Sequence, residues 1–196
     1  MAYTTIDNPE LYFQTKLYSG NDTDDHAITL DGDENMSPNL VWIKSRALTH
    51  NHQIHDTVRG VTKHISSDVT NAEATEATGL KSFDSDGFTL GTWDSVNVAS
   101  SGTYVAWCWK ESATAGFDMV AYTGNGSDDR TVSHSLSASV NFAIVKRKNQ
   151  TSNWLVQGDE VGTGFGQYIE LNATGALYTA SDNIKSVSSS VLTLGT

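Results

Sequence analysis

An acidic cluster near the N-terminus is the first set of residues whose types and spacing suit a ligand. The string Asn21-Asp-Thr-Asp-Asp25 is followed closely by Asp31-Gly-Asp-Glu34. Carboxylates beside an asparagine can supply the several oxygens that Ca²⁺ requires on a flexible loop, although the glycine and the distal glutamate of an EF-hand are missing. Asn and Asp side chains also cap the backbone of turns. We predict a turn at residues 22–25 and keep a calcium loop as the alternative.

Three histidines, His50, His52 and His55, form a second set. Imidazoles two positions apart on a strand point to the same side, where they can share a metal ion. The related second half of the chain has Ser152 and Trp154 in place of His50 and His52. Because the fold does not require histidine at these positions, we expect surface histidines and no metal site.

Trp93 is the aromatic residue that we expect to contact a ligand. It follows Gly91-Thr92 and precedes Asp94, which predicts an exposed position near a loop, and sugars stack on exposed aromatic rings. The sequence contains no nucleophile elbow, phosphate-binding loop or zinc-protease pattern, and no pair of carboxylates stands out as a glycosidase acid and base. We therefore expect no catalytic residue, no cofactor and no enzymatic activity.

The composition restricts the partners of the chain. A formal net charge of −11 disfavours nucleic acid, because binding to phosphates needs a basic surface. No apolar stretch approaches the length of a membrane span, so we expect no membrane insertion and synthesis in the cytoplasm of the producing cell. The one cysteine, Cys108, lies in an apolar run and is expected to be buried.

The elements that position these residues occur twice. Residues 18–25 recur as residues 122–129, residues 39–44 as 141–146, and residues 80–92 as 184–196. The first offset is 122 − 18 = 104, the second is 102, and the third is again 104. We therefore expect two β repeat units, residues 1–112 and 113–196. Features of both copies belong to the fold, whereas features of one copy, such as Trp93, are where a specific function resides.

Strands are predicted throughout, because runs rich in Val, Ile, Tyr, Phe, Trp and Thr alternate with turn-forming residues. Residues 81–90 predict a hairpin, and residues 103–109 predict a central strand with both faces buried. The second copy should begin with a strand at residues 117–122. The best helical candidate is residues 71–78.

The second copy has no counterpart of the strand at residues 103–109, because it stops at the position equivalent to Thr92. A sheet without this central strand has an exposed edge. We expect that the natural chain continues past Thr196. The alternative is that another segment or subunit supplies the strand.

Several strings resemble an uncharacterised repeat domain family found in virion proteins of marine phages and cyanophages. They lie at residues 39–44, 55–60, 79–91, 103–110 and 117–126. The resemblance implies an all-β fold, an antiparallel β-sandwich of the concanavalin or jelly-roll type built from two tandem repeats. It also implies a structural or host-facing protein of the phage particle, and it transfers no catalytic residue.

The expected function is that of a non-enzymatic virion protein, an appendage, fibre or capsid decoration. Its expected partners are other virion proteins and further copies of itself, with host surface polysaccharide as an additional contact. The alternative function is a glycan-binding adhesin, and a polysaccharide depolymerase is a more remote one.

Overall fold

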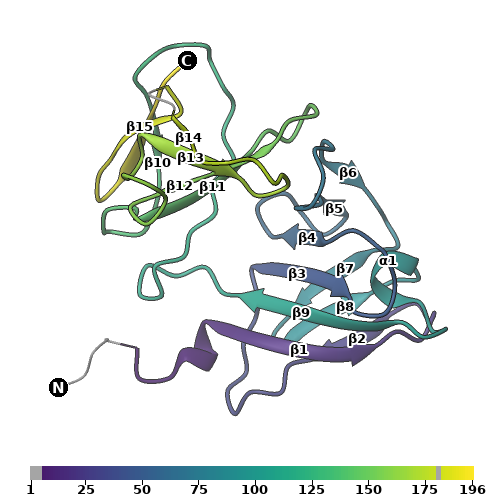
Figure 1. Ribbon diagram of the computed structural model, residues 1–196. Coiled ribbons are helices and arrows are strands. Elements are labelled where there is room, and N and C mark those ends of the chain that lie inside the picture. The colour runs from purple at the N-terminus through teal and green to yellow at the C-terminus, as the bar shows by residue number, and fades with distance from the viewer. Residues whose placement is uncertain (1–5, 180–181) are drawn as a thin grey trace. The chain divides into compact units, whose positions relative to one another are not determined.

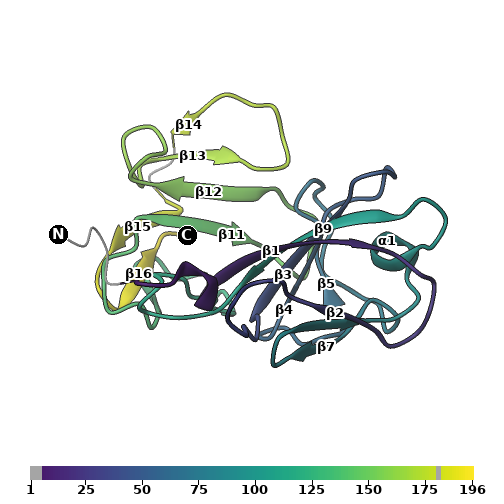
Figure 2. The same ribbon diagram turned by 90° about the horizontal axis from the view of Figure 1, so that it is seen from below.

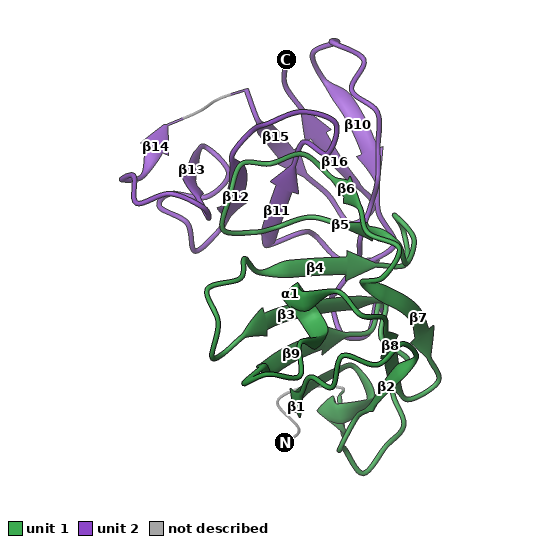
Figure 3. Cartoon of the chain, turned by 90° about the vertical axis from the view of Figure 1, so that its right-hand side faces the viewer, with its two compact units in different colours: residues 1–111 green, residues 112–196 purple. Residues whose placement is uncertain are grey.

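The computed structural model describes residues 6–179 and 182–196, and over these residues the protein is all-β with antiparallel sheets (Figure 1). Helical structure is confined there to a 3-10 turn, η1 (Pro9–Leu11), and one short helix, α1 (Asp94–Asn97). The chain forms two compact units, Met1–Glu111 and Ser112–Thr196 (Figure 3). We call them unit 1 and unit 2.

A four-stranded sheet forms one layer of unit 1. Its strands, in spatial order, are β1 (Phe13–Ser19), β9 (Thr103–Trp109), β3 (Leu40–Ser45) and β4 (Gln53–Asp56), as Figure 1 shows. The prediction of a central strand at residues 103–109 is confirmed, since β9 pairs with β1 on one side and β3 on the other. Its burial alternates: Tyr104, Ala106 and Cys108 are completely buried. The opposite face is only partly buried, so the expectation of two buried faces was wrong.

A three-stranded sheet forms the second layer of unit 1. Its order is β2 (His26–Thr29), β8 (Gly87–Leu90) and β7 (Leu80–Asp84). Strands β7 and β8 form the predicted hairpin. Gly87 has a φ of 125°, and a Cβ at this position would overlap the carbonyl oxygen of Ile28 in β2. Only glycine allows the hairpin to approach β2 this closely.

The core of unit 1 lies between these two sheets. Its buried apolar residues come from both layers, from the segment between β2 and β3, and from α1: Ile28, Leu30, Met36, Val41, Ile43, Leu80, Phe88, Leu90, Val96, Tyr104, Ala106 and Cys108. Burial raises the pKa of the Cys108 thiol to about 12. The thiol is therefore protonated at neutral pH, as expected of a buried apolar residue.

A two-stranded sheet follows β4 in unit 1, formed by β5 (Lys63–His64) and β6 (Ala74–Thr75). Ile54 of β4 forms an isolated bridge with Ile65, which ties this sheet to the edge of the larger one. Strand β6 lies inside the segment proposed as a helix, so that prediction was wrong. The segment lacks an apolar stripe to bury, and pairing with β5 satisfies its backbone instead.

The described residues of unit 2, 112–179 and 182–196, form two sheets (Figure 2). The three-stranded sheet has the order β10 (Arg130–Ser133), β16 (Val191–Leu194) and β15 (Ile184–Val187). The four-stranded sheet has the order β11 (Phe142–Lys146), β12 (Trp154–Gly158), β13 (Gln167–Glu170) and β14 (Tyr178–Thr179).

Strand pairing in unit 2 follows that in unit 1 at the sequence offsets given above. His26 faces Leu90 in unit 1, and Arg130 faces Leu194 in unit 2. The pairing of β3 with β4 in unit 1 matches that of β11 with β12 in unit 2. The pairing of β5 with β6 likewise matches that of β13 with β14. The predicted strand at residues 117–122 is not formed, apart from one bridge between Phe117 and Ser112. The aligned strand in unit 1, β1, pairs with β9, and the described strands of unit 2 include none that aligns with β9.

Candidate functional site

The outer face of the four-stranded sheet of unit 1 carries a group of aromatic side chains. The antiparallel register places Trp109 of β9 opposite Phe13 of β1 and Trp107 opposite Trp42 of β3. The ring centroids of Phe13 and Trp109 are 4.9 Å apart, and the ring of Trp42 lies 6.1 Å from Trp107 and 6.4 Å from Trp109. We call these four residues the aromatic face.

Strand periodicity builds the aromatic face. Successive side chains point to opposite sides of a strand, so the core takes Tyr104, Ala106 and Cys108 while Trp107 and Trp109 point outward. Phe13, at the edge of the sheet, is 39 % exposed. The face therefore offers flat aromatic surface that the core does not cover.

A hydrogen bond fixes one member of the aromatic face. The indole Nε1 of Trp42 donates to Nδ1 of His52 over 2.8 Å, and the two rings meet edge to face. A histidine that accepts through Nδ1 is neutral, and partial burial lowers the pKa of His52. Any ligand on this face thus meets a Trp42 ring whose polar group already has a partner.

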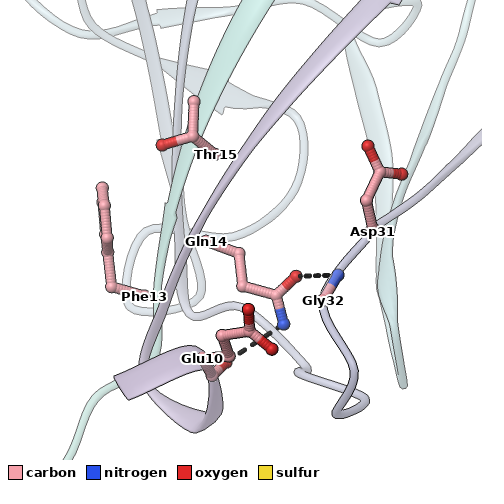
Figure 4. A pocket seen from close by; sticks show the side chains of 6 residues that line it. All are labelled: Glu10, Phe13, Gln14, Thr15, Asp31 and Gly32. Atoms are coloured by element: carbon pink, nitrogen blue, oxygen red, sulfur yellow. Dashed lines mark hydrogen bonds between the residues drawn. The ribbon is translucent and has the colours of Figure 1, made fainter. Parts of the chain in front are cut away.

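A shallow depression of about 300 Å³ lies beside Phe13 at the open edge of β1 (Figure 4). Its base is Gln14, which is 6 % exposed. The Gln14 amide donates to the carbonyl oxygens of Glu10 and Glu34, and its oxygen accepts from the Gly32 amide. One buried side chain therefore fixes the loop after β2 against β1.

Two carboxylates stand on the rim of this depression. Glu10 accepts a hydrogen bond from the backbone amide of Asp33 at 2.8 Å, and Asp31 pairs with Lys16. Carboxylate oxygens can accept hydroxyl hydrogen bonds, and an exposed ring can stack on the apolar face of a sugar. Within unit 1 this arrangement suits a polyhydroxylated ligand.

The sequence matches one protein family, a domain of unknown function called DUF7483, over residues 8–196. The chain belongs to the DUF7483 family. No curated protein and no solved structure matches it. In the described residues of this DUF7483 chain, no helix is long and apolar enough to cross a membrane.

The ring of Trp93 in the DUF7483 chain contacts His55 and His64 and is not part of the aromatic face. It is partly buried and packs against the core of unit 1, with its ring centroid 4.6 Å from that of His64. Its carbonyl oxygen accepts the first hydrogen bonds of α1, from Val96 and Asn97. The expectation of an exposed loop position was wrong, because the segment after Gly91 turns into α1 and draws the indole inward.

The three histidines are not brought together. His55 is completely buried, since all four residues of β4 are covered. His52 binds Trp42, and the carbonyl oxygen of His50 accepts from Lys44. The described residues contain no group of three or more His, Cys, Asp or Glu that could hold a metal ion. The expectation of surface histidines was wrong for His55, because the segment after β4 folds back over it.

The acidic cluster forms the predicted turn. Asn21 Oδ1 accepts from the amide of Thr23, and Asp22 and Asp25 have positive φ values of 56° and 60°. Lys81 of β7 pairs with Asp24 and Asp25 at 2.8 Å and 2.6 Å, and its hydrogen bond lowers the pKa of Asp24. These carboxylates thus already have a cationic partner.

The same arrangement recurs in unit 2 of the DUF7483 chain. Asn125 accepts from the amide of Ser127, and Lys185 pairs with Asp128 and Asp129 at 2.9 Å and 2.6 Å. Sequence reasoning missed the two lysines. Their recurrence in the aligned blocks at residues 80–92 and 184–196 was the signal that could have identified them.

A buried ion pair was also missed. The Arg59 side chain is 9 % exposed; its Nε donates to Asp56 Oδ2 at 2.5 Å and its Nη2 to the carbonyl oxygen of Ile54 at 3.0 Å. Asp56 Oδ1 also accepts from the Arg59 amide, closing a turn that continues through Gly60, whose φ is 96°. This pair holds the segment that covers His55. Its equivalents in unit 2, Gly158 and Val161, are uncharged.

Proposed function

We propose that this DUF7483 chain is a non-enzymatic structural protein of a phage particle, an appendage, fibre or capsid decoration made in the host cytoplasm. It acts by assembly with other virion proteins and with further copies of itself. The observation that carries the proposal is the apolar surface of unit 2.

Large apolar residues are exposed mainly in unit 2. Those that are 38–56 % exposed there are Val120, Tyr122, Phe142, Ile144, Ile169, Leu171, Leu177 and Tyr178. In unit 1 the large apolar residues exposed to this degree are Phe13, Leu17 and Val58. Exposed apolar side chains are the kind of surface that protein interfaces bury. The net charge of −11 favours protein over nucleic acid as the partner.

The proposal also concerns how the two units arose. We infer that they are tandem copies of one sandwich of the concanavalin or jelly-roll type. The supporting observations are the equivalent strand pairs, the paired lysines of the acidic turns and the bulges that follow Leu80 in β7 and Ile184 in β15. A duplicated sandwich offers two sets of edges and faces for assembly.

Purified phage particles test the proposal. An antibody against this chain should label the particles in electron micrographs, and mass spectrometry should detect the chain at a fixed stoichiometry to the major capsid or tail protein. Its absence from particles that infect normally would overturn the proposal.

A second function, glycan binding by an adhesin, is favoured by the aromatic face and by the two carboxylates that line the depression at Phe13. Host surface polysaccharide is the ligand class, and no nucleic acid or membrane insertion is involved. Trp93 remains the position proposed from sequence, so the two candidate positions can be compared directly.

Replacing Trp109 by Ala should weaken polysaccharide binding at least about tenfold, because it removes the ring that joins Phe13 to Trp42. Binding to a glycan array and titration calorimetry measure the effect. Trp93→Ala is the matched control. Loss of binding in that variant alone would place the ligand near α1, and equal binding by all three proteins would exclude both positions.

A further inference from the structure

Strand β1 forms an open edge of the four-stranded sheet of unit 1. Among the described residues it pairs with β9 alone, over 7 consecutive residues and without a bulge (Figure 1). The depression at this edge is lined by Phe13, Gln14 and Thr15, so this part of the edge is accessible (Figure 4). A long, regular edge strand is a template for pairing with another chain.

Two other edges of unit 1 are protected in ways that β1 is not. The edge of β4 is covered by the bridge between Ile54 and Ile65, and the ladder of β7 is interrupted by a bulge after Leu80. Strand β1 contains no proline. Its one charged residue, Lys16, pairs with Asp31 through a side chain that is only 20 % exposed. These are the features that usually keep an edge strand from pairing, and β1 lacks them.

The hydrogen bonds of β1 determine which of its main-chain groups face outward. Just before the strand, the Tyr12 carbonyl oxygen accepts from the Lys110 amide, and the ladder then continues without interruption. Main-chain groups alternate between the two sides of a strand. The even-numbered residues therefore bond to β9, and the N–H and C=O groups of Phe13, Thr15 and Leu17 point to the open edge.

The side chains of the same three residues make the strand self-complementary. Phe13 is 39 % exposed and Leu17 is 56 % exposed, and both lie two positions from Thr15, which is also exposed. When two copies of β1 run antiparallel about Thr15, each Phe13 faces a Leu17 of the other copy. Cross-strand pairs of an aromatic and an aliphatic residue stabilise a sheet.

The alternatives to this register are less favourable. Hydrogen bonds form only where outward-facing residues of both strands lie opposite each other. Centring the pair on Lys16 places two like charges opposite each other, which is destabilising. Centring it on Leu17 leaves Phe13 without a strand residue opposite it. Centring it on Thr15 places Gln14 opposite Lys16 and uses both apolar residues twice.

We propose that unit 1 binds a second copy of this chain through β1, by antiparallel pairing about a two-fold axis at Thr15. The two four-stranded sheets then join into one, with the aromatic faces of both copies on the same side of it. The hydrogen bonds of Gln14 already hold β1 in place, which lowers the cost of ordering the edge. The inference rests on the proposed function only in naming the surface through which copies of the chain assemble.

Sedimentation velocity of the full chain measures the dimer. Salt at about 0.15 M screens the repulsion between two chains of net charge −11. Concentrations up to about 0.5 mM are needed, because single strands bury less area than a standard interface. With rising concentration, hydrogen exchange should slow at the amides of Phe13, Thr15 and Leu17. The amides of Gln14 and Lys16, which face β9, should not change. A chain that stays monomeric, or a dimer without this pattern, would overturn the proposal.

Two variants at the axis test the main-chain bonds. Thr15→Pro removes an outward amide, which an edge strand tolerates, and should weaken dimerisation at least about tenfold. Thr15→Val keeps the amide and should dimerise at least as tightly as the original chain. Exchange rates in β3 verify that unit 1 is intact in both variants. Equal dimerisation by the two variants would contradict pairing through β1.

A disulfide tests the register. The Cα atoms of a hydrogen-bonded antiparallel pair are about 5.5 Å apart, which a disulfide can span. Thr15→Cys should therefore cross-link two copies under a mild oxidant. Leu17→Cys should not, because the two Leu17 positions lie about 13 Å apart along the strands. The original chain, with Cys108 buried, is the control. Cross-linking through Leu17→Cys alone would show that the axis is misplaced.

Failure of this inference is distinguishable from failure of the proposed function. Absence of the chain from phage particles would contradict the proposed function, and the purified chain should still dimerise through β1. A chain that is found in particles but forms no dimer through β1 would contradict this inference alone.

Discussion

Replacing Asn97 by Leu is expected to destabilise unit 1 by about 3–5 kcal/mol. The residue is completely buried, and its side chain joins four groups. Oδ1 accepts from the Asn21 amide and lies 2.7 Å from His26 Nδ1, and Nδ2 donates to the carbonyl oxygens of Thr23 and Gly91. Each buried polar group left without a partner costs about 1–3 kcal/mol. Water has partial access to the turn at Asn21, so the total loss of stability is smaller than the sum of the separate costs of the four groups.

Urea unfolding followed by tryptophan fluorescence measures this loss. Trp42, Trp93, Trp107 and Trp109 lie in unit 1 and only Trp154 lies in unit 2, so the signal follows mainly unit 1. Asn35→Leu is the matched control, because Asn35 is exposed and such substitutions change stability by about 0.5 kcal/mol or less. Equal midpoints for the two variants would show that the Asn97 hydrogen bonds do not hold the unit together.

The second large effect is a loss of stability on acidification through His55. Burial lowers the pKa of His55 to about 3, and electrostatic interactions with His64 and Arg59 act in the same direction. The unfolded chain binds a proton near pH 6.5, but the folded unit keeps His55 neutral. Stability is therefore complete above that pH and is lost as the pH falls from about 6.5 toward 3, at up to ~1.4 kcal/mol per pH unit.

Between pH 7.5 and pH 5 the contribution of His55 amounts to about 2 kcal/mol. His52 and His64, whose pKa values are lowered by burial, add to the loss. His55→Gln is the matched variant, because Gln157 occupies the equivalent position in unit 2 and is 1 % exposed. The urea midpoint of unfolding, measured at several pH values, should fall less steeply with decreasing pH in this variant than in the original chain. Parallel slopes would mean that His55 gains a proton without unfolding.

The local features of the fold were predictable from sequence because their causes are local. The alternation along residues 103–109 predicted which side chains of β9 share a face, although not which face meets the core, and Gly87 marked the hairpin turn. The turn at residues 22–25 followed from side chains that bond backbone atoms two positions away. Each depends on neighbours within a few residues.

The remaining features depend on contacts between distant segments. Asn97 belongs to a helix of four residues, and it is useful only because Asn21, 76 positions earlier, meets it. The burial of His55 requires β5 and Trp93 to fold over β4. The strand at residues 117–122 was predicted from propensity, but a strand needs a partner as well as a suitable sequence. The aromatic face was missed because its rings come from three strands.

The labelling rate of Cys108 is a measure of how often the core of unit 1 opens. Cys108 is the single cysteine of the chain, it lies in the middle strand, and its thiol is fully buried. A reagent can reach this sulfur only after the core of unit 1 opens at β9, and it reacts with the thiolate rather than the thiol. The rate of labelling therefore reports how often the central strand opens. Unit 2, which has no cysteine, adds nothing to that rate.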